Sequence, residues 1–123
     1  MPITPTPKIW MNGSLVDWAD ANVHILTHTL HYGMGVFEGI RAYETADGPA
    51  VFRLTEHIER LHNSAKILGM PMPYSVDDLI TATKETVAST GLDSCYIRPI
   101  AYLGYGEMGL NTLPCTVDVA IAC

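Results

Sequence analysis

The sequence predicts an α+β domain in which two helices pack on one face of a mainly antiparallel sheet. Segments rich in β-branched and aromatic residues, bounded by turn residues, occur toward both ends of the chain. Two segments between 54 and 90 instead repeat apolar residues at the helical period. This order favours helices gathered on one face of an antiparallel sheet, and 123 residues can bury one ordinary core.

The strand segments are marked by their turns. Residues 8–18 predict a hairpin, because Asn12-Gly13 is a strong two-residue turn signal between two short apolar runs. The other predicted strands span 36–44, 50–53, 94–103 and 116–122, with a turn at 46–49.

Two strand-like segments carry a complication. Pro99 lies inside 94–103, which predicts an edge position or a bulge because proline cannot donate to a strand ladder. Residues 22–32 are apolar, β-branched and rich in histidine, and their pattern leaves helix and strand both open.

Both helices have recognisable ends. The first apolar stripe starts at Leu54, with Thr55 as the expected N-cap and Gly69 as the end. Ser75 is expected to cap the second helix, with Asp78 completing a capping box and Gly91 ending it.

Composition narrows the classes of function. A net charge of −6 argues against nucleic acid or an anionic membrane as a partner. The three cysteines have no metal-type spacing and indicate a reduced, cytoplasmic compartment. Residues 1–7 lack an apolar signal-peptide core and predict a flexible leader, so the domain is expected to span 8–123.

Strand alternation places chemically useful side chains together on the segment 94–103. Tyr96 and Arg98 share one face, and the alternate residues form an apolar face. A guanidinium can bind a carboxylate through two parallel hydrogen bonds, and a neighbouring phenol can contact the same anion. A solvated face is the alternative interpretation.

The segment 36–44 follows the same pattern. Phe37, Gly39 and Arg41 share a face that could form the wall of a pocket, since glycine inside a strand often marks a close approach. A bulge with nothing bound is the alternative. Glu38 falls on the opposite, apolar face, where a buried carboxylate requires a partner that the sequence does not identify.

Other charged and histidine side chains have ordinary explanations. Arg60 lies four residues after Glu56, so a surface ion pair would account for it, with phosphate binding as the alternative. Three histidines at 24, 28 and 31 could line one helix face, but no further ligand completes a recognised zinc pattern, and no metal site is expected. His57 and His62 are expected on the helix surface.

Longer motifs point to a family. The stretches HTLHYGMGVFEGIRAY (28–43), FRLTEHIERLHNSAKIL (52–68) and YIRP (96–99) resemble the fold-type IV aminotransferases, and specifically bacterial branched-chain amino-acid aminotransferases. The resemblance runs from Ile9 to Ala122. It implies that the chain is the small N-terminal domain of an enzyme that uses pyridoxal phosphate.

The resemblance also implies roles for individual residues. Arg60 matches the arginine that binds the cofactor phosphate, and Tyr96 and Arg98 match the pair that binds the substrate carboxylate. The remaining matches are pocket-wall positions Phe37 and Gly39, a supporting Arg41, and residues Tyr32 and Leu110 that reach the other subunit of a homodimer or higher homo-oligomer.

The lysine that holds the cofactor in this family has no match. The chain contains Lys8, Lys66 and Lys84, none in the expected context, so it is expected to be inactive alone, with a second domain supplying that lysine. The implied parent reaction moves the amino group of leucine, isoleucine or valine to 2-oxoglutarate. A D-amino-acid aminotransferase, an aminodeoxychorismate lyase and a non-catalytic dimerisation or binding fragment remain as alternatives.

Overall fold

The computed structural model describes residues 2–123, and Met1, part of the predicted leader, lies outside the described residues. Residues 2–6 of the leader form no helix or strand. The strands are β1 (Lys8–Met11), β2 (Ser14–Asp17), β3 (Gly35–Phe37), β4 (Ile40–Thr45), β5 (Gly48–Val51), β6 (Cys95–Leu103) and β7 (Val117–Ala122). The helices are α1 (His28–Tyr32), α2 (Leu54–Ile67) and α3 (Val76–Thr90), with a 3-10 turn at Trp18–Asp20.

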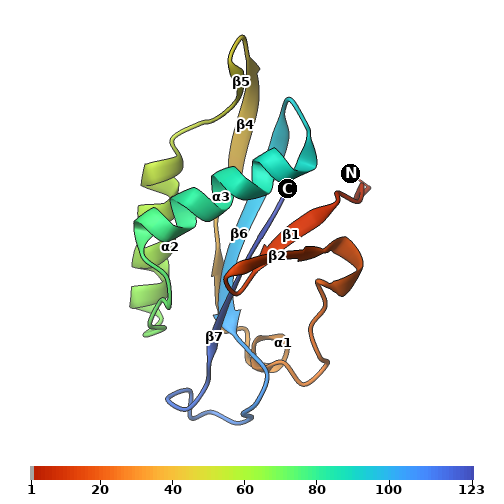
Figure 1. Ribbon diagram of the computed structural model, residues 1–123. Helices are drawn as coiled ribbons and strands as arrows, with labels where there is room; N and C mark the ends of the chain where they lie inside the picture. The colour runs from red at the N-terminus through yellow and green to blue at the C-terminus, as the bar shows by residue number, and fades with distance from the viewer. Residues whose placement is uncertain (1) are drawn as a thin grey trace.

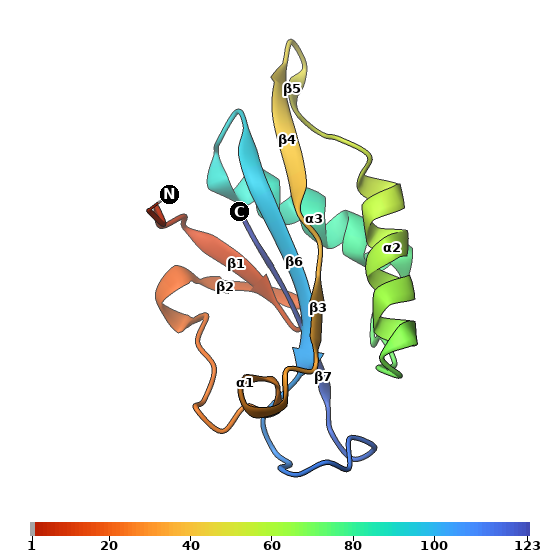
Figure 2. The ribbon, with the colours of Figure 1, turned by 180° about the vertical axis from the view of Figure 1, so that it is seen from behind.

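The strands form one antiparallel sheet in the order β2-β1-β7-β6-β4-β5, and β3 pairs with β6 beyond the end of β4. Helix α3 lies across one face of this sheet, and α2 lies along the β3 side (Figure 1). Seen from behind, the opposite face is free of both helices (Figure 2). The predicted fold class is therefore confirmed.

The core lies between the helices and the covered face of the sheet. Its side chains come from the inward stripe of each helix and from alternate strand positions, as the two periodicities require. The largest fully buried apolar members are Ile40, Ile58, Leu61, Leu79, Ile97, Val119 and Ile121.

The turns and caps mostly follow the sequence. Asn12 and Gly13 both have positive φ, as the predicted two-residue hairpin requires. Ser75 and Asp78 form the predicted capping box, and Gly91 ends α3 in a left-handed conformation. The N-cap of α2, however, is Arg53 rather than Thr55, and β5 begins at Gly48, so the β4–β5 turn is shorter than expected.

Pro99 contradicts its prediction, because β6 lies between β7 and the β3–β4 edge and is not an edge strand. The register is also unchanged from Phe37↔Ile100 to Ile40↔Ile97, so no bulge is inserted. The Glu38 amide donates to the Pro99 carbonyl at 3.1 Å, but proline has no N–H to return. This missing bond explains why β3 and β4 are two strands rather than one.

Candidate functional site

Most of the predicted site residues lie on the face of the sheet that α2 and α3 leave uncovered. Over the first four residues of β4 and the first six of β6, exposed or half-buried side chains alternate with buried ones, as the strand period predicts. The residues brought together on the uncovered face are Phe37, Gly39, Arg41, Tyr96 and Arg98. The predicted sharing of one face by Tyr96 and Arg98 is therefore confirmed.

Arg98 is held by two aromatic neighbours. Its Nη2 donates to the Tyr96 hydroxyl at 2.7 Å, and its guanidinium carbon lies 4.2 Å from the centre of the Phe37 ring. Within residues 2–123 it has no carboxylate partner. The Tyr96 hydroxyl accepts from Arg98 and so keeps its own proton for an anion bound beside the guanidinium. A carboxylate is the ligand that this arrangement fits.

Gly39 makes room for the Tyr96 hydroxyl. A Cβ atom at position 39 would lie 2.7 Å from that oxygen, closer than the two atoms can approach. Gly39 lies in the break between β3 and β4 rather than inside a strand, and it marks a close approach as the sequence predicted. Phe37 is 57 % exposed beside it, so hydrocarbon and polar groups meet at one surface.

Glu38, between Phe37 and Gly39, points the other way and contacts α2. It is 4 % exposed and accepts hydrogen bonds from Arg60 Nε at 2.5 Å and Arg60 Nη2 at 2.7 Å. His57 Nδ1 lies 3.1 Å from the same carboxylate. The expected surface pair between Arg60 and Glu56 does not form, because the buried carboxylate is the stronger partner for a fork-shaped guanidinium.

The charges at this contact are fixed by these bonds. The Arg60 hydrogen bonds lower the pKa of Glu38 below its usual range, against the opposing effect of burial, and the His57 contact adds to the lowering. The Glu38 carboxylate in turn raises the pKa of Arg60. Glu38 is therefore ionised at neutral pH, and Arg60 is charged and oriented.

Arg60 fits a phosphate group. The Arg60 side chain is 68 % exposed, and Glu38 engages only Nε and Nη2, so further N–H groups of the guanidinium face outward. Because Glu38 is flanked by Phe37 and Gly39, the same short segment links the phosphate-binding candidate to the carboxylate-binding candidate.

Tyr32 belongs to α1 and Leu110 to the loop at 104–116, and both segments lie at the same end of the molecule (Figure 1). Tyr32 is 40 % exposed and Leu110 is 88 % exposed. Both segments lie beside the C-terminal end of β6, whereas Tyr96 and Arg98 belong to the first half of that strand (Figure 2). That separation is compatible with the expectation that they serve another subunit.

The histidines bond to the protein rather than to one another. His28 Nε2 lies 2.8 Å from the Gly109 carbonyl, and His31 Nε2 lies 2.8 Å from the Ile25 carbonyl. Among residues 2–123 no group of histidine, cysteine and acidic side chains could hold a metal ion. His57 and His62 are half-buried and hydrogen-bonded, so the expectation that they are on the helix surface is wrong.

The cysteines offer no reactive thiolate on the sheet. Burial raises the pKa of Cys95, and burial raises the pKa of Cys123 to about 12. Both thiols are therefore protonated at neutral pH and are poor nucleophiles.

Comparison with known proteins decides the family. The model of the family described as "Amino-transferase class IV" matches residues 35–123. The chain belongs to the class IV aminotransferases.

Individual relatives are similar over most of the chain. A branched-chain-amino-acid aminotransferase of Pseudomonas aeruginosa is 53 % identical over 114 residues, which are 93 % of this chain and 37 % of the relative. The crystal structure of the Escherichia coli branched-chain amino acid aminotransferase matches with a TM-score of 0.91 and 47 % identity, over 95 % of this chain and 39 % of that one.

A third similar protein is a solved structure that is named together with a bound ligand. The archaeal branched-chain aminotransferase of Thermoproteus uzoniensis with norvaline matches with a TM-score of 0.90 and 45 % identity, over 95 % of this chain and 40 % of that one. This class IV aminotransferase chain therefore spans less than half the length of the relatives it matches. No helix of residues 2–123 is long and apolar enough to cross a membrane.

The structural contacts of two further residues, Glu38 and His28, cannot be predicted from the sequence. Glu38 stands out there only as an isolated buried carboxylate, and its pairing with Arg60 depends on how α2 packs against β3. His28 stands out only as a possible metal ligand. Its segment, 22–32, leaves helix and strand both open in the sequence, so its burial against the loop at 104–116 cannot be predicted from the pattern.

Proposed function

We propose that this chain is the N-terminal part of an aminotransferase that moves the amino group of leucine, isoleucine or valine to 2-oxoglutarate with pyridoxal phosphate. The observation that carries the proposal is the Arg98 guanidinium, which has no carboxylate partner among residues 2–123, bonds to Tyr96 and stacks on Phe37. The names of the relatives, and the unbranched aliphatic amino acid norvaline in the Thermoproteus uzoniensis structure, support the same reaction.

One surface has to accept two kinds of side chain in this reaction. A branched aliphatic side chain packs on the ring of Phe37 and on the ring of Tyr96. The side-chain carboxylate of glutamate instead binds the Arg98 guanidinium and the Tyr96 hydroxyl. The Arg98 guanidinium stacks on the Phe37 ring. When an aliphatic side chain is bound and offers no carboxylate, this cation–π contact still stabilises the charge of Arg98.

Arg60 would bind the cofactor phosphate, oriented by Glu38 as described above. Bound pyridoxal phosphate supplies the electron sink that transamination requires. Arg41 lies beside Tyr43 on the uncovered face and adds a second positive charge to the surface that carries Arg98.

The lysine of the reaction would come from a further domain of a longer polypeptide. Lys8 is paired with Asp17 on the first hairpin, and Lys66 and Lys84 are exposed on the helices. None lies on the face that carries Tyr96 and Arg98. The described residues would therefore bind and orient substrate and cofactor, and would not perform the proton transfer.

The proposed assembly is a cytoplasmic homodimer or higher homo-oligomer. Exposed apolar side chains gather on the α1 segment and on the loop at 104–116, including Leu30, Tyr32, Tyr105 and Leu110. Such a surface suits an interface with a second copy. In that arrangement Tyr32 and Leu110 would complete the substrate site of the partner.

The test is an assay of the full-length protein with L-leucine and 2-oxoglutarate, alongside D-alanine and alongside the 123-residue chain. We expect the full-length protein to form glutamate from L-leucine and not from D-alanine, and the short chain to form none. Activity with D-alanine alone would favour a D-amino-acid aminotransferase. An absence of both activities, with no binding of pyridoxal phosphate, would favour a binding fragment.

A further inference from the structure

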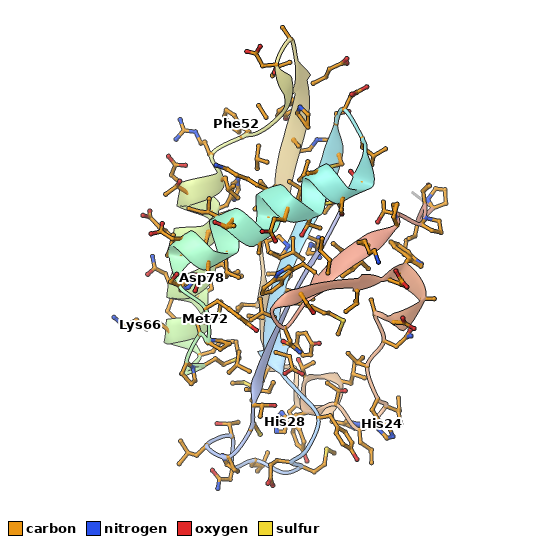
Figure 3. All side chains as sticks on the ribbon, viewed as in Figure 1. His24, His28, Phe52, Lys66, Met72 and Asp78 are labelled. Atoms are coloured by element: carbon orange, nitrogen blue, oxygen red, sulfur yellow. The ribbon has the colours of Figure 1, made fainter. Side chains whose placement is uncertain are left out.

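His28 lies at the junction between α1 and the loop at 104–116. Figure 3 shows its side chain at this end of the molecule, next to the loop that joins β6 to β7. The side chain is fully buried, although its neighbours on the helix, Leu30, His31 and Tyr32, are exposed. A histidine with no exposed surface at the edge of a small helix requires an explanation.

The contacts of His28 join two segments that are far apart in the sequence. Its backbone N–H donates to the Gly104 carbonyl at 3.2 Å, and its Nε2 donates to the Gly109 carbonyl at 2.8 Å. Its ring also stacks on Tyr32, with 4.5 Å between ring centres. The residue after Gly109 is Leu110, so one imidazole touches Tyr32 and anchors the residue beside Leu110.

Packing alone does not account for this histidine. A carbonyl can only accept, so Nε2 carries a proton, and in the neutral ring Nδ1 is then an acceptor. Nδ1 is buried and has no hydrogen-bond partner among residues 2–123. A buried acceptor without a partner is unfavourable, and a leucine of similar volume would avoid it. The benefit that offsets this defect is the bond to Gly109.

We propose that His28 is a positioning residue, which holds Tyr32 and Leu110 in one fixed arrangement through its ring stack and its hydrogen bond to Gly109. The inference rests on the proposed function, in which these two side chains complete the substrate site of a second subunit. His28 itself touches neither substrate nor cofactor. It acts on substrate binding through the α1–loop unit.

The structure provides a matched control on the same helix. His31 also bonds to a carbonyl at 2.8 Å, but that carbonyl belongs to Ile25 in the same segment. His31→Leu therefore removes a similar interaction without affecting the link to the loop. His28→Gln provides the rescue, because the glutamine amide can place an N–H near the position of Nε2.

The experiment measures hydrogen exchange and steady-state kinetics on the full-length protein with each variant. In His28→Leu we expect faster amide exchange over residues 105–113, and a kcat/KM for L-leucine that is lower by roughly tenfold or more, mostly through a higher KM. His31→Leu should match the unaltered protein, and His28→Gln should recover most of both losses. Should His28→Leu not fold, His28→Asn, which is too short to reach Gly109, replaces it.

The two readouts separate this inference from the proposed function. Unchanged exchange over 105–113 in His28→Leu would overturn the inference, whatever the activity, and so would a His28→Gln variant as impaired as His28→Leu. If the unaltered protein does not transaminate, the proposed function fails. The exchange comparison still shows whether His28 holds the loop.

Discussion

The Glu38 carboxylate and the Arg60 guanidinium form a two-point contact, with Nε at 2.5 Å from one oxygen and Nη2 at 2.7 Å from the other. Glu38 belongs to the short break between β3 and β4, and Arg60 belongs to α2. The contact therefore fixes the helix that carries the proposed phosphate ligand to the strand that carries the proposed substrate wall. Movement of either element would disturb both parts of the site.

Replacing Arg60 with lysine should weaken cofactor binding. Lysine keeps the charge, but its single ammonium cannot hold Glu38 at two points and also face a phosphate, as the guanidinium can. We expect the dissociation constant of pyridoxal phosphate from the full-length Arg60→Lys protein to rise by roughly tenfold. Absorbance titration of the cofactor measures the change.

The control for this prediction is Lys66→Gln, which removes a positive charge from the same helix. Lys66 points away from the molecule on the outer side of α2 (Figure 3). Its loss should leave the dissociation constant unchanged, because exposed charges separated by about 10 Å are largely screened at ordinary salt. An equal effect of both variants would mean that net charge, rather than the Arg60 geometry, governs binding.

Stability should depend on the ionisation of Glu38. Its pKa in the folded state is lowered from an ordinary 4.5, first by the Arg60 hydrogen bonds, against burial, and also by His57. A group with a lowered folded pKa stabilises the fold above its unfolded pKa. That contribution is lost as pH falls through the folded value.

The matched variant for the pH prediction is Glu38→Gln, which has no charge to lose. We expect it to be less stable than the unaltered protein at about pH 7, and the difference to shrink as pH falls below the ordinary carboxyl pKa of 4.5 and through the lowered folded value. Urea unfolding of the two full-length proteins across this range measures the difference. A constant difference in the free energy of unfolding would show that the charge of Glu38 is not involved.

How much the sequence predicts depends on how local the rule is. The sharing of faces by Tyr96 and Arg98, and by Phe37 and Gly39, follows from the alternation of an extended chain, and the structure confirms both. The capping box at Ser75 is equally local and is also confirmed.

The wrong predictions for Pro99 and for Arg60 both depend on which segments of the chain become neighbours in the fold. The strand order around Pro99 is a property of the whole sheet, so local rules wrongly favour an edge position. Pro99 is tolerated in the middle of the sheet because it faces Glu38, in the break between β3 and β4, where no N–H is returned to the partner strand. Arg60 has an adequate partner four residues away on its own helix, so helical spacing alone favours the wrong acid. Tertiary packing overrides such local pairs when a buried carboxylate is within reach.

Arg98 should matter more for glutamate than for leucine. Its guanidinium has no carboxylate partner within the described residues, and the Tyr96 hydroxyl beside it can contact the same anion. We expect Arg98→Gln to raise the KM for glutamate by roughly 10- to 100-fold, as the loss of a charge-assisted contact implies, and to change the KM for leucine by less than about threefold. Steady-state kinetics of the full-length protein in both directions measure this. Equal losses for both substrates would assign Arg98 a structural role.

Gly39 should be required because of the Tyr96 hydroxyl and for no other reason. A Cβ at position 39 meets that oxygen at 2.7 Å but the ring carbon that bears it at an ordinary 3.4 Å. Gly39→Ala should therefore displace the hydroxyl and raise the KM for glutamate, with little change in the temperature of unfolding.

The same clash is absent from Tyr96→Phe, so a double-mutant cycle isolates it. In the Tyr96→Phe background, the increase in the KM for glutamate caused by Gly39→Ala should be less than about a third of the increase in the unaltered protein, because the oxygen that the added Cβ would meet is absent. The KM for glutamate of the four full-length proteins gives the coupling. If Gly39→Ala raises the KM for glutamate by the same factor with phenylalanine at position 96 as with tyrosine, the close approach to Tyr96 is not the reason for the glycine. Gly39 would then be required for the backbone conformation or for direct contact with the bound ligand.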